Sequence, residues 1–213
     1  MSLGSTFHVT GNPTWSNLDD PVQRRVFKSF VKQKTVWDMG ADNLAMAAMM
    51  IADCDVAHVV AVDRDSGVRQ FLPRFGPRAS EIITVRQQWF CNLPFDTLEA
   101  QVAFIGWPSN FENEIYRVVD CPRVETVIYL GKNSDNLQCG TQNLFNSLRR
   151  RELLAYVPRL RNTLIVVGKH LPDGQDRPSA GAEEAPDWES YGDIPFAVES
   201  DILPGTRRIP VEL

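Results

Sequence analysis

Apolar and polar residues follow two different periods along this chain. Short apolar runs, several of them rich in Val and Ile, alternate with stretches whose apolar positions recur every three or four residues. The short runs predict buried strands, and the longer stretches predict amphipathic helices. The predicted strands are 35–37, 58–62, 82–85, 101–105, 124–130 and 163–167. The predicted helices are 21–33, 43–52, 66–75, 111–119 and 141–156.

This alternation predicts an α/β fold. Strands that are apolar along their whole length are buried on both faces, and the helices between successive strands supply the cover. Right-handed crossovers then give a doubly wound, mostly parallel, Rossmann-like sheet of about six or seven strands with helices on both faces. In such sheets ligands bind beyond the carboxyl ends of the strands. The turns that follow the first four strands are therefore the candidate positions for a site.

Pattern and composition divide the chain into four parts. Residues 1–33 are expected to form a turn-rich segment and a helix that packs on the core, with Asp20 as the N-cap of that helix. Residues 34–168 hold the alternating strands and helices. Residues 169–193 are rich in Pro, Gly and acids and predict a mobile acidic loop. Residues 194–213 predict a C-terminal strand and tail.

Composition narrows the class of protein. The chain has 213 residues, of which 43% are hydrophobic and 23% charged, as in ordinary globular domains. The net charge of −5 argues against broad nonspecific binding to nucleic acid, which needs a basic surface. The four cysteines lack metal-binding spacing, and the three histidines are scattered, so we expect reduced thiols in a cytoplasmic protein and no metal site. No apolar run approaches the roughly 20 residues that span a membrane, and we expect no membrane partner.

The turn after the first predicted strand carries the most specific pattern. The strand ends in Asp-Met-Gly-Ala-Asp-Asn (38–43), and the next predicted helix follows directly. Gly40 allows a sharp turn and lets a ligand approach the backbone. A dinucleotide-binding turn would show G-x-G-x-x-G, and this turn has a single glycine. The carboxylate of Asp38 suits a cationic ligand group better than a pyrophosphate, which disfavours a nicotinamide-dependent oxidoreductase.

This turn resembles motif I, Asp-x-Gly-x-Gly-x-Gly, of the class I methyltransferases that depend on S-adenosylmethionine (SAM). The resemblance implies that Asp38, Gly40 and Ala41 hold the methionine part of SAM. Asp42 and Leu44 stand where the family has its second and third glycines. We expect the Asp42 side chain to cap the helix that begins near residue 43. The alternatives are that it faces the ligand and pairs with a cationic group, or that it does neither and its charge repels the SAM carboxylate and leaves the pocket empty.

The second predicted strand ends in Asp63, which matches the acid of motif II in the same family. An acid at this strand end accepts hydrogen bonds from ribose hydroxyls, as it does in dinucleotide folds. A solvated strand-end acid is the alternative interpretation. The resemblance places Arg64 beside the adenine, and a side chain that simply faces solvent is again the alternative.

Residues 92–95, Asn-Leu-Pro-Phe, resemble the Leu-Pro-Phe that often follows motif III. The acid that usually reads adenine would fall near Trp89, where the chain has no acid. The amide of Gln88 or Gln87 would then read the base instead. Trp89 or Phe90 would stack on the ring, with core packing as the alternative role for at least one of them.

The fourth predicted strand ends in Gly106, Trp107 and Pro108, at the position of motif IV. Family members that methylate base amines have Asp, Asn or Ser followed by Pro-Pro-aromatic here. This chain has the aromatic before the proline and Gly106 at the polar position, which disfavours methylation of a base amine. Trp107 is expected to line a substrate pocket or cover the cofactor, or alternatively to pack under the next helix.

No set of Ser, His and Asp or of Cys and His is recognisable, so the catalytic residues stay unknown. Arg149, Arg150 and Arg151 lie on the predicted helix 141–156. Such a run is expected to form a solvated face, and contact with an acidic substrate or an RNA backbone is the alternative.

These patterns predict a SAM-dependent methyltransferase whose methyl acceptor, small or macromolecular, is unknown. Such enzymes act mainly by proximity and orientation, so a missing acid–base pair counts little against this prediction. The alternative is a non-catalytic protein of the same fold that acts as a scaffold or partner-binding module, which the replaced glycines favour. A homo-oligomer stays open.

Overall fold

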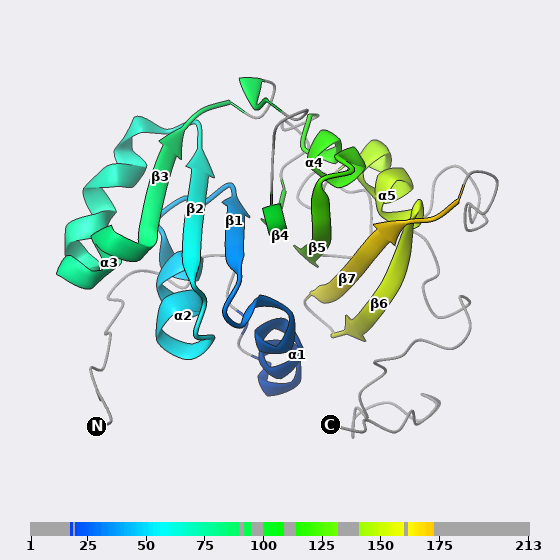
Figure 1. Ribbon diagram of the computed structural model, residues 1–213, viewed down its shortest axis with the longest axis horizontal. Coiled ribbons are helices and arrows are strands. Elements are labelled where there is room, and N and C mark those ends of the chain that lie inside the picture. Colours follow the sequence, from blue (N-terminus) through cyan, green and yellow to red (C-terminus); the bar gives the residue numbers. More distant parts are fainter. Residues whose placement is uncertain are drawn as a thin grey trace.

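The computed structural model describes residues 18, 20–89, 92–94, 100–108, 114–131, 141–159 and 162–172. Seven strands form a single sheet: β1 (Thr35–Met39), β2 (His58–Asp63), β3 (Ile83–Gln87), β4 (Ala100–Gly106), β5 (Val124–Gly131), β6 (Arg151–Pro158) and β7 (Thr163–His170). Their order across the sheet is β3-β2-β1-β4-β5-β7-β6, so β3 and β6 form its two edges (Figure 1).

Strands β3, β2, β1, β4 and β5 are parallel, which confirms the predicted doubly wound, mostly parallel, Rossmann-like sheet. β7 is antiparallel to both β5 and β6. After β3 the chain crosses to β4 on the other side of β1, so the strand order reverses between β1 and β4. Ligands bind at this switch point in open α/β sheets.

Helices cover both faces of the sheet. On one face lie α1 (Pro21–Val31), α2 (Ala45–Asp53), the 3₁₀ helix η1 (Ser66–Phe75) and α3 (Pro77–Ile82). On the other lie α4 (Tyr116–Asp120) and α5 (Gln142–Arg149). Successive side chains of β1 alternate between the two cores: Val36 packs under α1 and α2, and Trp37 packs on the side of α4 and α5.

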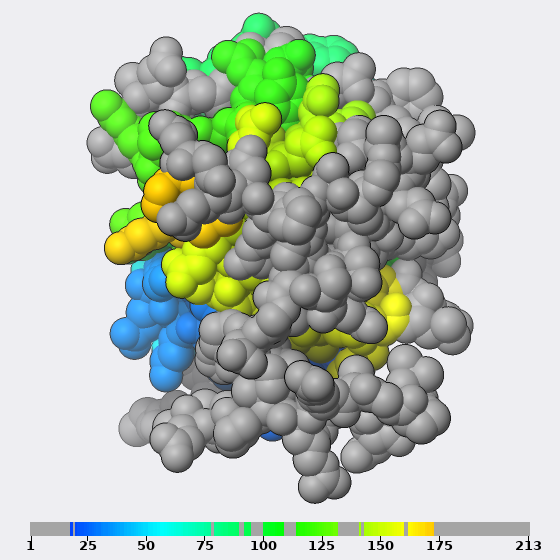
Figure 2. Space-filling view, turned by 90° about the vertical axis from the view of Figure 1, so that its right-hand side faces the viewer, coloured from blue at the N-terminus to red at the C-terminus, as the bar shows by residue number. Residues whose placement is uncertain are grey.

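The start of α1 agrees with the sequence. Asp20 is its N-cap, and one carboxylate oxygen accepts the N–H groups of Val22 and Gln23 at 3.0 and 2.9 Å. The other oxygen accepts Nε of Arg159 at 2.7 Å, which ties α1 to the end of β6. Figure 2 shows α1, in blue, directly beside the yellow-green of β6. The helix ends at Val31, two residues before the predicted end.

The prediction of one long helix over 141–156 is wrong. α5 ends at Arg149, and residues 151–158 form β6 instead. The segment Glu-Leu-Leu-Ala-Tyr (152–156) has good helix formers, but pairing with β7 decides its conformation. The element predicted over 66–75 is a 3₁₀ helix with Pro73 inside it, rather than an α-helix.

Other expectations fall only partly on the described residues. The helix predicted over 111–119 is observed as α4, and 111–113 lie outside the described residues. β7 extends to His170, into the first residues of the predicted acidic loop. The rest of that loop and the predicted C-terminal strand lie outside the part of the chain that the structure describes.

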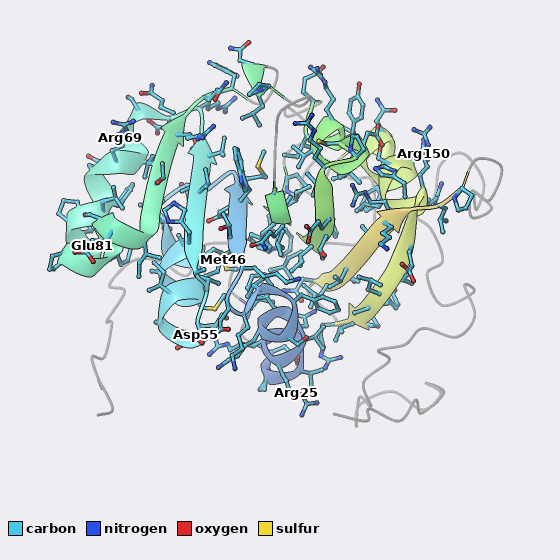
Figure 3. All side chains as sticks on the ribbon, viewed as in Figure 1. Arg25, Met46, Asp55, Arg69, Glu81 and Arg150 are labelled. Atoms are coloured by element: carbon cyan, nitrogen blue, oxygen red, sulfur yellow. The ribbon has the colours of Figure 1, made fainter. Side chains whose placement is uncertain are left out.

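The expectation of a solvated arginine face is also wrong. Arg151, at the first position of β6, is fully buried, and Arg149 is 3% exposed. The Arg151 guanidinium donates to the carbonyls of Val119, Cys121, Val124 and Gly168 at 2.7–2.9 Å. Arg150 alone of the three points outward, and it lies 3.9 Å from the Asp120 carboxylate (Figure 3). Arg151 therefore joins α4, β5 and β7 at the outer half of the sheet.

Candidate functional site

The candidate site lies at the carboxyl ends of β1, β2, β3 and β4. Asp38 is at its base, 2% exposed, in register with Ala61 of β2 and Phe104 of β4. Side chains alternate along a strand, so Asp38 points to the same face as Val36, on the side of α1 and α2. A carboxylate buried between two apolar neighbours is costly unless something pairs with it.

The turn after β1 is held against β2. The N–H groups of Gly40 and Ala41 both donate to the carbonyl of Val62, at 2.9 and 3.1 Å. Gly40 has a φ of +83°, a conformation that L-residues rarely adopt. Apart from Gly40 and its two chain neighbours, no atom of the described residues lies within 4 Å of the point where a Cβ on Gly40 would sit. This side of the turn is therefore open to the approach of a ligand.

Asp42 and Leu44, at the positions of the second and third glycines of motif I, have left-handed backbone conformations. Asp42 has a φ of +45° and Leu44 a φ of +63°, both in the left-handed region. That region costs an L-residue roughly 1–2 kcal/mol relative to the right-handed one. Backbone strain of this kind concentrates at functional sites. The turn thus has a positive φ at each of the three positions that correspond to the glycines of motif I.

Asp63 connects the turn to the next two segments. One carboxylate oxygen accepts the N–H of Asp42 at 2.9 Å, and the other accepts the N–H of Asp65 at 2.9 Å. Its backbone carbonyl accepts the N–H of Gln88 at 2.8 Å. Asp63 is therefore more than a solvated strand-end acid, because it fixes the relative positions of the turns after β1, β2 and β3.

The hypothesis that Asp42 caps the following helix is wrong. α2 begins at Ala45, later than predicted, and the Ala45 N–H donates to the Asn43 side chain at 3.0 Å. The N-cap position of α2 is Leu44, which has no side-chain cap hydrogen bond. Asp42 is exposed and lies near Asp63 and Asp65.

The carboxylates of Asp42 and Asp63 act on Asp38. Burial, together with the charges of Asp63 and Asp42, raises the pKa of Asp38 to about 7. Burial also raises the pKa of Asp42, with Asp63 as the second cause. Oδ2 of Asp38 is buried and has no hydrogen-bond partner among the described residues. A cation at this position would satisfy that oxygen and lower the pKa of Asp38.

Arg64 and Trp89 meet at the outer rim of the site. The Arg64 guanidinium lies 5.2 Å from the centre of the Trp89 ring, and Trp89 is 56% exposed. Gln88, between them and the sheet, donates its side-chain N–H to the carbonyl of Asn92. The two side chains predicted to flank adenine are thus neighbours, and they stack on each other.

Gly106 and Trp107 form the β4 side of the site. The N–H of Trp107 donates to the carbonyl of Leu130 at 2.7 Å, so pairing with β5 continues one residue past the strand. Trp107 has a φ of +48° and is half-buried. The left-handed turn at Trp107 lies next to β1, on the side of the switch point away from Asp63.

The structure brings the predicted site residues together at the carboxyl ends of the strands. Asp38, Gly40 and Ala41 lie at the end of β1, Asp63 and Arg64 at the end of β2, Gln88 after β3, and Gly106 and Trp107 at the end of β4. Sequence reasoning missed the backbone role of Asp42 and the left-handed conformation of Leu44. The family's glycine positions were the one signal that pointed to that conformation.

Two further observations bear on the kind of site. No group of three His, Cys, Asp or Glu residues within the described ranges is arranged to hold a metal ion. Among the same residues, no helix is both long enough and apolar enough to cross a membrane.

No protein-family model matches the chain, and no curated protein matches it in sequence. Solved structures do match. A Streptococcus agalactiae protein of the NADB-Rossmann superfamily is 15% identical with a TM-score of 0.53, over 73% of this chain and 72% of that one.

Two further matches are assigned as methyltransferases. A Streptococcus pneumoniae protein assigned as a tRNA (m1A22) methyltransferase was solved in complex with S-adenosyl-L-methionine. It is 17% identical with a TM-score of 0.53, over 74% of this chain and 75% of that one. An Escherichia coli protein assigned as the methyltransferase yhhF is 12% identical with a TM-score of 0.52, over 73% and 88% of the two chains. At these identities the likeness shows the fold, which is Rossmann-like and of the class I methyltransferase type.

Proposed function

We propose that the site at the carboxyl ends of β1, β2, β3 and β4 binds SAM and that the protein is a SAM-dependent methyltransferase. The observation that carries the proposal is the buried Asp38, whose Oδ2 lacks a partner among the described residues, at the base of a turn with positive φ at all three motif I glycine positions. Burying a carboxylate without a partner is costly, and a cationic ligand group would offset that cost. The Streptococcus pneumoniae structure of the same fold, solved with SAM, supports this choice of ligand.

Each side of the proposed pocket has a role in binding. Asp38 would pair with the cationic end of SAM, and the open side of Gly40 would admit it to the backbone. Asp63 would accept hydrogen bonds from the ribose hydroxyls, since each of its oxygens has a second lone pair beyond the N–H group that it already accepts. The Arg64 guanidinium and the Trp89 ring would separate and receive the adenine between them.

Bound SAM supplies an activated methyl group for transfer to a nucleophile. The residues of this chain would act by holding that group in place and aligning the acceptor with it, because proximity and orientation supply most of the rate in such transfers. The half-buried Trp107 at the end of β4 would cover the reacting end of the pocket. The methyl acceptor, small or macromolecular, is not specified by these residues.

A dinucleotide is disfavoured as the ligand. A pyrophosphate needs N–H donors at the first turn, and the N–H groups of Gly40, Ala41 and Asp42 are already bonded to β2. The acidic side chains around the turn would also repel it.

Cys54 and Cys121 are buried thiols, and we propose a cytoplasmic location because of this cysteine usage.

Calorimetric titration with SAM and with S-adenosylhomocysteine tests the proposal. We expect SAM to bind the wild type, and Asp38→Asn to weaken that binding at least tenfold, because the variant loses the charge that faces the cationic end. Asp53→Asn is the matched control, since Asp53 lies at the far end of α2 and pairs only with exposed Arg24 at 3.7 Å. A wild-type protein that binds neither compound would instead support a scaffold or partner-binding module.

A further inference from the structure

The turn between β1 and α2 has few backbone N–H groups left for an anion. Among residues 40–45, all but Asn43 donate their N–H groups in hydrogen bonds within the chain. The acceptors are the Val62 carbonyl (twice), the Asp63 carboxylate, the Ala41 carbonyl and the Asn43 side chain. The next two N–H groups belong to buried residues, Met46 at 6% and Ala47 at 0% exposure. Among the described residues, a ligand carboxylate at this turn would therefore meet few backbone donors.

The same turn is surrounded by negative charge. The charged groups that shift the pKa values of Asp38 and Asp42 are all acidic, namely Asp38's neighbours Asp42 and Asp63 and, for Asp42, also Asp65. The nearest arginine along the chain, Arg64, is turned to the Trp89 ring. A carboxylate brought to this turn would be repelled by like charges within a few ångströms.

One buried oxygen points independently to a cationic ligand. Oδ2 of Asp38 is buried, and no described residue gives it a hydrogen bond. An ammonium group with three N–H donors would satisfy it. Among the described residues, the site therefore offers a buried carboxylate to the amino group of SAM, whereas the carboxylate of SAM would meet acidic neighbours.

We propose that this site selects an adenosyl sulfonium whose amine-bearing arm lacks the carboxylate, and so prefers decarboxylated SAM to SAM. The inference rests on the proposed function, because it assumes that the pocket holds an adenosyl sulfonium at all. Decarboxylated SAM carries two positive charges, on the sulfonium and the ammonium, whereas SAM carries a carboxylate that offsets one of them. Both molecules bear the same activated methyl group, so the preference leaves the proposed transfer chemistry unchanged.

Asp42 sets this preference, because its carboxylate stands where the family has a glycine. In Asp42→Gly the backbone N–H that bonds Asp63 is kept, and glycine adopts a φ of +45° without strain. Asp55→Gly is the matched control: Asp55 has a φ of +56°, is exposed, and lies before β2 at the amino end of the sheet (Figure 3).

The test is calorimetric titration of the full chain at pH 8 with SAM and with decarboxylated SAM. We expect decarboxylated SAM to bind the wild type and Asp55→Gly at least tenfold more tightly than SAM, about 1.4 kcal/mol. Asp42→Gly should bind SAM more tightly and reduce the ratio several-fold. A wild-type ratio below tenfold, with SAM bound, overturns the preference and leaves the proposed function intact.

Two other outcomes are decisive. If Asp42→Gly keeps the wild-type ratio, the assignment of the preference to Asp42 is wrong. If neither sulfonium binds the wild type or either variant, the proposed function fails, and the preference falls with it.

Discussion

The backbone N–H of Asp42 donates a 2.9 Å hydrogen bond to Oδ2 of Asp63. This bond joins the turn after β1 to the end of β2, at the side of the sheet where the strand order reverses. Because the donor is a backbone group, the bond does not depend on the Asp42 side chain. Because the acceptor is a carboxylate, it depends wholly on Asp63.

Asp63→Ala should therefore weaken SAM binding by about 1–3 kcal/mol, the range for loss of a charge-assisted hydrogen bond. The variant loses the acceptor for the ribose and also the anchor of the Asp42 N–H. Calorimetric titration measures the change. Asp53→Ala is the control, because Asp53 is exposed, lies at the far end of α2 and is paired with Arg24 at 3.7 Å. Equal affinities for wild type and Asp63→Ala would show that Asp63 does not hold the ribose.

Asp42→Gly should raise the free energy of unfolding by about 1 kcal/mol at pH 8. Glycine relieves the left-handed φ of +45°, and loss of the carboxylate removes its repulsion with Asp38 and Asp63. Asp55→Gly relieves a similar φ of +56° away from these acids. Urea denaturation of both variants separates the two causes. If Asp55→Gly stabilises the protein as much as Asp42→Gly, repulsion among the site carboxylates contributes nothing measurable.

The sequence predicted the inner half of the sheet well because each strand there is an apolar run bounded by turn residues. β2 and the acid that ends it, Asp63, follow directly from the run Val-Val-Ala-Val-Asp (59–63). The left-handed conformations of Asp42 and Leu44 do not follow from those residues, which prefer negative φ. The turn that contains these two residues is hydrogen-bonded to β2 at the Val62 carbonyl and the Asp63 carboxylate.

The outer half of the sheet was mispredicted for a different reason. Residues 151–158 carry helix-forming residues with apolar positions that fit either period, and the pairing of β6 with β7 is a contact between separate segments. The buried position of Arg151 has no signal in the local sequence, where it follows two other arginines. Only the fold brings the carbonyls that it contacts together.

Arg151→Met should lower the free energy of unfolding by about 3 kcal/mol or more, because several buried carbonyls lose their donor at once. The carbonyls of Val119, Cys121, Val124 and Gly168 all accept from this guanidinium. Arg150→Met is the control: its side chain is 54% exposed and its ion pair with Asp120 is 3.9 Å long, so we expect a change within about 0.5 kcal/mol. Urea denaturation of both variants gives the comparison, and similar losses would contradict the role of Arg151.

The raised pKa of Asp38 makes folding stability depend on pH. Burial, with the charges of Asp63 and Asp42, raises this pKa from 3.8 to about 7. Between those two values the folded protein holds a proton that the unfolded chain has released, so the free energy of unfolding falls as pH rises from about 4 to about 7 and then levels off. Asp38→Asn, which stays neutral, should lose this component of the dependence. Urea denaturation from pH 5 to pH 8 measures both slopes, and an unchanged slope in the variant would show that Asp38 is not the titrating group.

The same proton links ligand binding to pH. A cationic ligand at Asp38 favours the ionised carboxylate, so binding below pH 7 must release the proton that the raised pKa retains. Affinity for SAM should therefore rise as pH increases from about 5.5 to about 7 and change little above that. Calorimetric titration at pH 6 in two buffers with different enthalpies of ionisation should show net proton release, and Asp38→Asn should show less. Affinity that is flat over this range, with no proton released, would mean that the cation does not meet Asp38.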